Sequence, residues 1–154
     1  MANFLMPVGH TISTDTRETD DALVDTARND VVLERRITVG RGPIGDIAAG
    51  DAGVVVANFG SDSVSILDPA GRALGADVSV EGEPTAVIAT RDRAFVATAS
   101  ASHDAVSVID LETRSVVATF PVAFGVTALA VSPDGKRVYA GRTLGDRVDI
   151  AVID

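Results

Sequence analysis

The sequence of 154 residues predicts an all-β fold, a β-propeller made of four-stranded antiparallel blades, with about three blades' worth of strands in the chain. Short apolar runs alternate with turn residues about every ten positions, and no stretch keeps a clear helical period. DSVSILD from Asp62 recurs as DAVSVID from Asp104 and as DRVDIAVID from Asp146, each at an offset of 42 residues. Polarity is graded within each repeat, because the first strand is small and apolar and the last carries charge. That gradient favours strands arranged outward from a central axis.

Each repeat contains four expected strands, taken here in chain order. The first strand follows Gly-Pro, Glu-Pro or Gly-Val, the second is rich in Val, Phe and Tyr, and the third is the Val-Ser-Ile-Leu segment and its variants. The fourth strands are expected over 72–80 and 114–122, and an earlier one over 31–39. The predicted organisation is a polar, disordered leader (1–20), the end of a blade (21–39), two full blades (40–80 and 81–123) and an incomplete blade (124–154).

The third repeat carries the most specific motif. Its SPDGKRVYA and DRVDIAVID segments, together with SVVATFPV before them, resemble the YVTN-type (YncE-like) β-propeller repeat over about 22–154. The resemblance implies a WD40-like propeller but no single function, because such propellers include surface proteins, DNA-binding proteins and relatives of lactonases. The chain departs from the pattern in two ways. The first two copies lack Ser-Pro-Asp-Gly, and Asn follows the second strand only at Asn58, with Thr98 and Gly141 elsewhere.

The strand count raises the question of how the ring closes. Twelve expected strands make three blades, whereas closed propellers have about four to eight. Either the chain is the N-terminal part of a longer propeller, for which seven blades are usual in the family it resembles, or two chains close a six-bladed ring as a homodimer. In the second case residues 31–39 complete the last blade of the partner. Both alternatives stay open from the sequence.

Composition and charge limit the classes of function. The net charge of −9 argues against nucleic acid as a partner, because such binding needs a basic surface. The chain has no Cys and only two His, so we expect no cofactor and no metal site. The N-terminal segment has no basic start and only a short apolar stretch, so no signal peptide or membrane span is expected. The cytoplasm is favoured, with secretion or the cell surface left open.

The predicted ligand-binding residues share one end of the blades. We call this the entry end, since the connections between blades and the loops between second and third strands lie there; the remaining turns form the far end. Far-end turns mix basic and acidic residues, which predicts a solvated surface. The acids that open the third strands (Asp62, Asp104 and Asp146) are expected to bind backbone. The entry end offers Arg41, Asn58, Glu83, His103, Arg142 and Arg147.

Two functions of different classes fit these residues. The first is a non-enzymatic binding or scaffold module that presents its entry-end loops to a protein, a glycan or a small ligand. No acid, base and nucleophile occur at a spacing that indicates catalysis, so no catalytic residue is predicted. The alternative is a lactonase-like hydrolase, active only in a complete ring, in which Glu83, His103 and Arg142 converge near the axis.

Overall fold

The computed structural model describes residues 35–123 and 125–154, so the expected leader and the segment 21–34 lie outside the described residues. The chain divides into two units, Met1–Arg36 and Ile37–Asp154, and the elements below all belong to the second. Among the described residues, no helix has the length and apolar character needed to cross a membrane.

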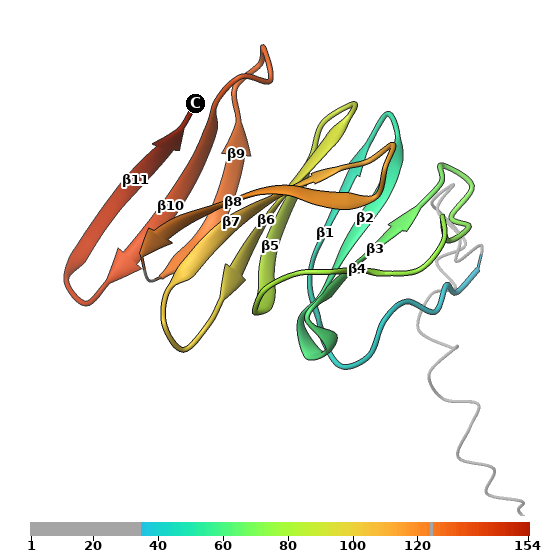
Figure 1. Cartoon of the computed structure of the whole chain (residues 1–154), viewed down its shortest axis with the longest axis horizontal. Helices are drawn as coiled ribbons and strands as arrows, with labels where there is room; N and C mark the ends of the chain where they lie inside the picture. The colour runs from blue at the N-terminus through green and yellow to red at the C-terminus, as the bar shows by residue number, and fades with distance from the viewer. Residues whose placement is uncertain (1–34, 124) are drawn as a thin grey trace, which may run out of the picture. The chain divides into compact units, whose positions relative to one another are not determined.

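In the described residues, eleven strands form three antiparallel sheets, and in each sheet the strands follow one another in chain order (Figure 1). Turn residues separate the strands, as the spacing predicts, and the only helical turn among the described residues is the 3-10 turn η2 (Phe59–Ser61). The first sheet contains β1 (Ile44–Gly50), β2 (Gly53–Asn58), β3 (Ser63–Leu67) and β4 (Val78–Ser79); the second β5 (Glu83–Ala89), β6 (Arg93–Ala99), β7 (Asp104–Asp110) and β8 (Ser115–Ala123); and the third β9 (Val126–Val131), β10 (Val138–Leu144) and β11 (Arg147–Ile153).

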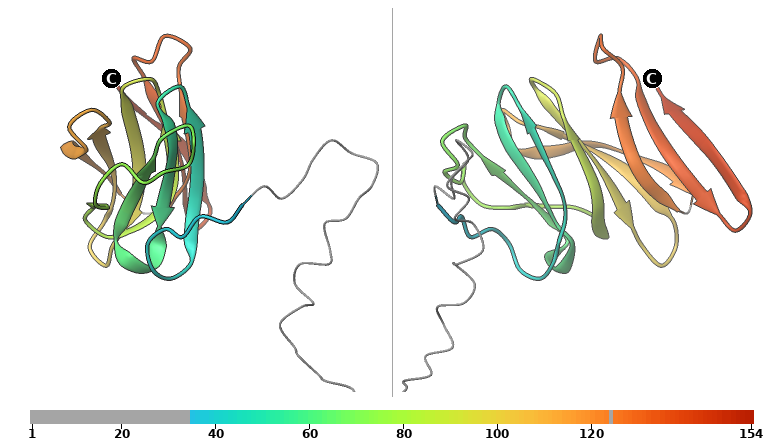
Figure 2. Two further views of the ribbon diagram at one scale, coloured as in Figure 1. Left: turned by 90° about the vertical axis from the view of Figure 1, so that its right-hand side faces the viewer. Right: turned by 180° about the vertical axis from the view of Figure 1, so that it is seen from behind.

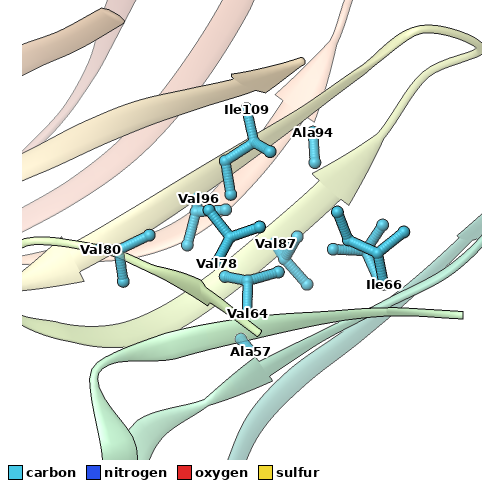
Figure 3. Close-up of a cluster of buried hydrophobic side chains, with 10 residues drawn as sticks. Ala57, Val64, Ile66, Val78, Val80, Val87, Ala94, Val96 and Ile109 are labelled. Atoms are coloured by element: carbon cyan, nitrogen blue, oxygen red, sulfur yellow. The ribbon is translucent and has the colours of Figure 1, made fainter. Parts of the chain in front are cut away.

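The hydrophobic core lies between the sheets in two layers. The layer between the first and second sheets includes Val64, Ile66, Val96 and Ile109 (Figure 3). A second cluster joins the second and third sheets. Because the second sheet is covered on both faces, β6 and β7 are nearly continuous apolar runs with no exposed side chain inside them. The sheets therefore stack face to face, like consecutive blades (Figure 2).

The first strands of the three sheets are successive neighbours, since β5 packs against both β1 and β9. Their approach is close at Gly45, where an added Cβ would lie 2.3 Å from the carbonyl oxygen of Pro84. Small residues are needed where backbones approach this closely. Ile47, Ile88 and Leu129 lie in these three strands, which confirms the expected equivalence of the first strands.

The outer strands differ from the prediction in length and regularity. Only Val78–Ser79 of the expected strand 72–80 forms a ladder, preceded by one isolated bridge between Leu67 and Ala73. The chain turns away between them at Gly75, whose φ is 88°. β8 is long but interrupted by two register shifts and by Pro121, which cannot donate to a ladder. Residues 35–39, the described part of the earlier expected strand, are not in a strand.

Candidate functional site

Two of the six predicted residues, Arg142 and Arg147, line one hollow at the entry end of the third sheet. Arg142 lies near the end of β10 and Arg147 opens β11 after a two-residue turn. The hollow measures about 200 Å³, and Ala123, Leu144 and Asp149 complete its lining. It therefore combines two guanidinium groups, one carboxylate and a small apolar surface.

Arg142 is held by three hydrogen bonds. It stands directly opposite Asp149 in the ladder of β10 and β11. Its Nε and Nη2 donate to the two carboxylate oxygens of Asp149 at 2.7 and 2.8 Å, and its Nη1 donates to the carbonyl oxygen of Val122 at 2.7 Å. The hydrogen bond from Arg142 lowers the pKa of Asp149, and the charges of Arg142 and Arg147 add to this effect. The pair is thus fully charged at neutral pH and ties the third sheet to the end of β8.

Arg147 is the more available cation of the hollow. Its side chain is exposed, and it makes no hydrogen bond or ion pair within residues 35–123 and 125–154. The residues that line the hollow carry two positive charges and one negative charge, because Asp149 is the one acid among them. The hollow therefore favours an anionic group.

Asn58 lies inside the structure, although the sequence placed it on an exposed loop. It ends β2 with only 1% of its surface exposed. Its Nδ2 donates to Ser65 Oγ at 2.9 Å and to Ser63 Oγ at 3.3 Å, while Ser65 Oγ donates to Asp77 at 2.7 Å. Ser65 has one hydroxyl hydrogen, so it must accept from Asn58, and this fixes the orientation of the amide. Asn58 Oδ1 has no partner among the described residues.

The ladder positions revise one equivalence between the repeats. Asn58 stands opposite Ser63, Thr98 opposite Ala105, and Arg142 opposite Asp149. The third copy of this position is therefore Arg142, and the expected match with Gly141 is wrong by one residue. The position lies four residues before the Asp of the first repeat and six residues before that of the second, so the spacing did not show which residue of the third repeat corresponds to it.

The three groups of the hydrolase alternative lie at the entry end but are not joined by hydrogen bonds among the described residues. His103 Nδ1 is 3.0 Å from Ser102 Oγ, and Arg142 is engaged with Asp149. Glu83 is exposed at the start of β5. Hydrolysis through these groups stays a prediction. The remaining predicted residue, Arg41, is exposed, and its backbone N–H donates to Ser61 Oγ at 3.3 Å.

Two carboxylates connect neighbouring sheets. Asp104, buried at the start of β7, accepts hydrogen bonds from the backbone N–H groups of Gly125 at 2.7 Å and Val126 at 3.0 Å. Asp46 of β1 accepts one from the backbone of Val87 at 3.0 Å. Backbone binding was expected for Asp104, but the partner in the next sheet was not. Asp46 was missed altogether, because its position is not an Asp in the other repeats.

A larger hollow lies at the far end, where sequence reasoning expected only solvated turns. It measures about 530 Å³ and lies between the β5–β6 turn and the β9–β10 turn. Each turn holds its own carboxylate by a hydroxyl group, Thr90 with Asp92 at 3.3 Å and Ser132 with Asp134 at 2.6 Å. The Ser132 hydrogen bond lowers the pKa of Asp134. The lining is of mixed charge, with Arg91 and Arg93 beside these acids.

No group of three or more His, Asp or Glu side chains suited to a metal ion occurs in the part of the chain that the structure describes.

Three stacked antiparallel sheets, with their first strands side by side and an apolar layer between each pair, define a β-propeller; the described residues contain three of its blade sheets, the third with three strands. The chain is 38% identical over 146 residues to a seven-bladed β-propeller protein of Mycobacterium tuberculosis. The alignment covers 90% of this chain and 37% of the relative. A second seven-bladed β-propeller protein, from Mycolicibacterium smegmatis, is 46% identical over 83 residues, or 50% of this chain and 23% of the relative. The chain thus spans little more than a third of the first relative. No family model matches it.

Solved structures agree on the fold. Kuenenia stuttgartiensis hydrazine synthase superposes with a TM-score of 0.65 and 24% identity, over 74% of this chain and 34% of that one. A eukaryotic initiation factor superposes with a TM-score of 0.60 and 18% identity, over 78% and 32% of the two chains. At these identities the likeness concerns the fold alone.

Proposed function

We propose that the chain is a non-enzymatic binding module of a β-propeller, and that its ligand carries a carboxylate group bound in the Arg142–Arg147 hollow. The observation that carries the proposal is the exposed guanidinium of Arg147, which has no hydrogen-bond or ion-pair partner among the described residues, beside the Arg142–Asp149 ion pair. Both arginines lie on strands, and a site built on strands keeps its geometry better than one on loops.

The lining indicates the rest of the ligand. Leu144 and Ala123 give the hollow an apolar side, and its volume suits a small molecule or the end of a peptide. A carboxylate on a short apolar body combines both requirements. A protein presenting such a group is one form of this ligand; glycans without acidic groups fit the hollow less well.

The experiment is a titration of the isotope-labelled chain with N-acetyl-leucine, followed by NMR. We expect shifts in the amides of residues 144–149 and of Ala123, and binding weakened by Arg147→Gln. Arg91→Gln is the matched control, because Arg91 is an exposed arginine in the far-end hollow. Shifts confined to residues 90–93 and 132–135, or binding that Arg147→Gln leaves unchanged, would contradict the assignment.

We also propose that the repeat is of the YVTN type. The Ser132–Gly135 turn is closed by a hydrogen bond from the Gly135 N–H to the Ser132 carbonyl at 2.8 Å, and Asn58 ends its strand bonded into the following strand. Both features match the resemblance seen in the sequence. The test is whether these two contacts recur in the blades of the mycobacterial relatives once their structures are determined.

A further inference from the structure

The far-end hollow has the size of a site for a small ligand. It lies between the β5–β6 turn and the β9–β10 turn, both at the upper end of their sheets in Figure 1. Its volume of about 530 Å³ falls within the range of roughly 300–1,000 Å³ that is typical of small-molecule sites. Its lining shares no residue with the Arg142–Arg147 hollow, so it is a candidate for a second binding site.

The two turns hold their acids in the same way. Ser132 Oγ donates to Asp134 Oδ1 at 2.6 Å, and Thr90 Oγ1 donates to Asp92 Oδ1 at 3.3 Å. Each hydroxyl also accepts a hydrogen bond from a backbone N–H that follows in its own turn. Because these bonds position Oδ1 in both carboxylates, Oδ2 is left for a ligand. The hydrogen bond from Ser132 lowers the pKa of Asp134, so this acid is charged at neutral pH.

Arginine side chains supply the opposite charge. Arg91 is exposed and makes no hydrogen bond or ion pair within residues 35–123 and 125–154, so its guanidinium N–H groups are all available. Arg93 stands opposite Asp110 in the ladder of β6 and β7, and its charge contributes to the lowered pKa of that acid. Arg91 is therefore the cation of the hollow that is more available to a ligand.

The charges of the lining balance one another. Two arginines and two aspartates line the hollow, and the strand ends and the turn add apolar side chains: Ala89, Val131 and Pro133. A ligand with a single charge would meet a like charge beside each opposite one. A ligand that carries both charges on one small body can pair with an arginine and an aspartate at the same time, and charge-assisted hydrogen bonds of this kind are the strong ones.

We propose that the far-end hollow binds a zwitterionic α-amino acid with an apolar side chain. Its ammonium group donates to Asp134 Oδ2, its carboxylate accepts from the guanidinium of Arg91, and its side chain contacts the apolar part of the lining. This ligand is separate from the one bound in the Arg142–Arg147 hollow, so the proposal does not depend on the function proposed above.

The test is a titration of the isotope-labelled chain with L-leucine, followed by NMR. We expect shifts in the amides of residues 90–93 and 134–135. N-acetyl-leucine lacks the ammonium group and leucine amide lacks the carboxylate, so each should bind there at least about tenfold more weakly. Equal affinity of leucine and leucine amide at this site would overturn the proposal. Leucine shifts confined to residues 144–149 would also overturn it, while leaving the entry-end site intact.

Two variants then test the contacts. Asp134→Asn keeps an oxygen for Ser132 but loses the charge, and Arg91→Gln loses the guanidinium, so each should weaken leucine binding by about tenfold. The matched controls are Asp51→Asn, an exposed acid in the β1–β2 turn, and Lys136→Gln, an exposed cation next to the hollow. Both controls should bind leucine as the wild type does, and the amide spectrum checks that every variant is folded. Equal weakening by variants and controls would mean that only the overall charge of the far end matters, and would overturn the site.

Discussion

The carboxylate of Asp104 in the second sheet accepts a 2.7 Å hydrogen bond from the backbone N–H of Gly125, which leads into the third sheet. A second bond, from Val126 at 3.0 Å, reaches the same oxygen. One buried side chain therefore fixes the entry of the next sheet. The acids Asp62, Asp104 and Asp146 recur at one position of the repeat, but they do not make the same hydrogen bonds.

Replacing Asp104 tests this connection. Asp104→Asn keeps the shape but removes the charge that strengthens both hydrogen bonds, so we expect a loss of about 1–2 kcal/mol in the free energy of unfolding. Asp62→Asn is the control, since Asp62 occupies the same repeat position and tolerates Asn at its φ of 46°. Its change should stay within about 0.5 kcal/mol. Urea unfolding measures both; equal losses would contradict the difference between them.

The approach of the first strands predicts a steric effect at Gly45. Gly45→Ala places a methyl group against the backbone carbonyl of Pro84, which cannot move aside, so we expect a loss of about 1–3 kcal/mol. Gly141→Ala is the control, because its Cβ meets Ala128 at an ordinary 3.7 Å and its φ is not positive. That variant should be neutral or stabilised by less than about 1 kcal/mol. Thermal unfolding distinguishes the two.

The buried layer between the first two sheets predicts the cost of a small deletion. Ile109 has no exposed surface and packs in the cluster drawn in Figure 3. Ile109→Val removes one methylene group and should cost about 1 kcal/mol. Val117→Ala, at an exposed site, should change stability by less than about 0.5 kcal/mol. A smaller effect at 109 than at 117, measured by urea unfolding, would contradict the packing described.

The ion pair of the entry-end hollow predicts a pH effect. Asp149 has a folded-state pKa below its ordinary value, chiefly through the hydrogen bond from Arg142, so the folded state binds fewer protons than the unfolded one. Its stabilising contribution is complete above the unfolded pKa of about 3.9 and disappears as the pH falls through the lower folded value. The pKa values of Asp68, Asp110 and Asp134 are also lowered, so the melting temperature should fall below about pH 4.

Arg142→Gln removes the main cause of the shift at Asp149. The melting temperature of this variant should lie below that of the wild type at neutral pH. The difference should shrink as the solution is acidified. Arg91→Gln should follow the wild-type curve, since Arg91 is not a cause of any of the lowered carboxyl pKa values of the described residues. A constant difference between Arg142→Gln and wild type down to pH 3 would contradict the ion pair's role.

Much of the fold was predictable because it depends on local patterns. The recurrence of the segments that begin at Asp62 and Asp104 predicted the repeat. The small residues of the first strands predicted which side of each blade faces the axis. The fourth strands were predicted less well. Residues 72–80 alternate like a strand, but Gly75 bends the chain so that only Val78–Ser79 pairs.

The candidate site was predictable in its residue types but not in its assembly. Arg142 and Arg147 were both selected by sequence, yet Asp149, which neutralises one of them, was not. Asn58 was selected as a loop residue, but in the structure its side chain is buried and donates hydrogen bonds to Ser63 and Ser65. For Asp149 the missing information was the ladder register of β10 and β11, which two additional residues after Asp146 displace. For Asn58 it was the packing around the end of β2, which no local pattern shows.

The sequence alone determined the repeat, the all-β class and the order of the strands, because alternation and turn residues act between neighbours in the chain. The tertiary structure decided which charges meet and which apolar faces stay open. Val106 and Ile150 belong to the same repeat position, but one is buried and the other is two-thirds exposed. The difference lies only in whether another sheet stands in front of them, and that contact is made between residues distant in the sequence.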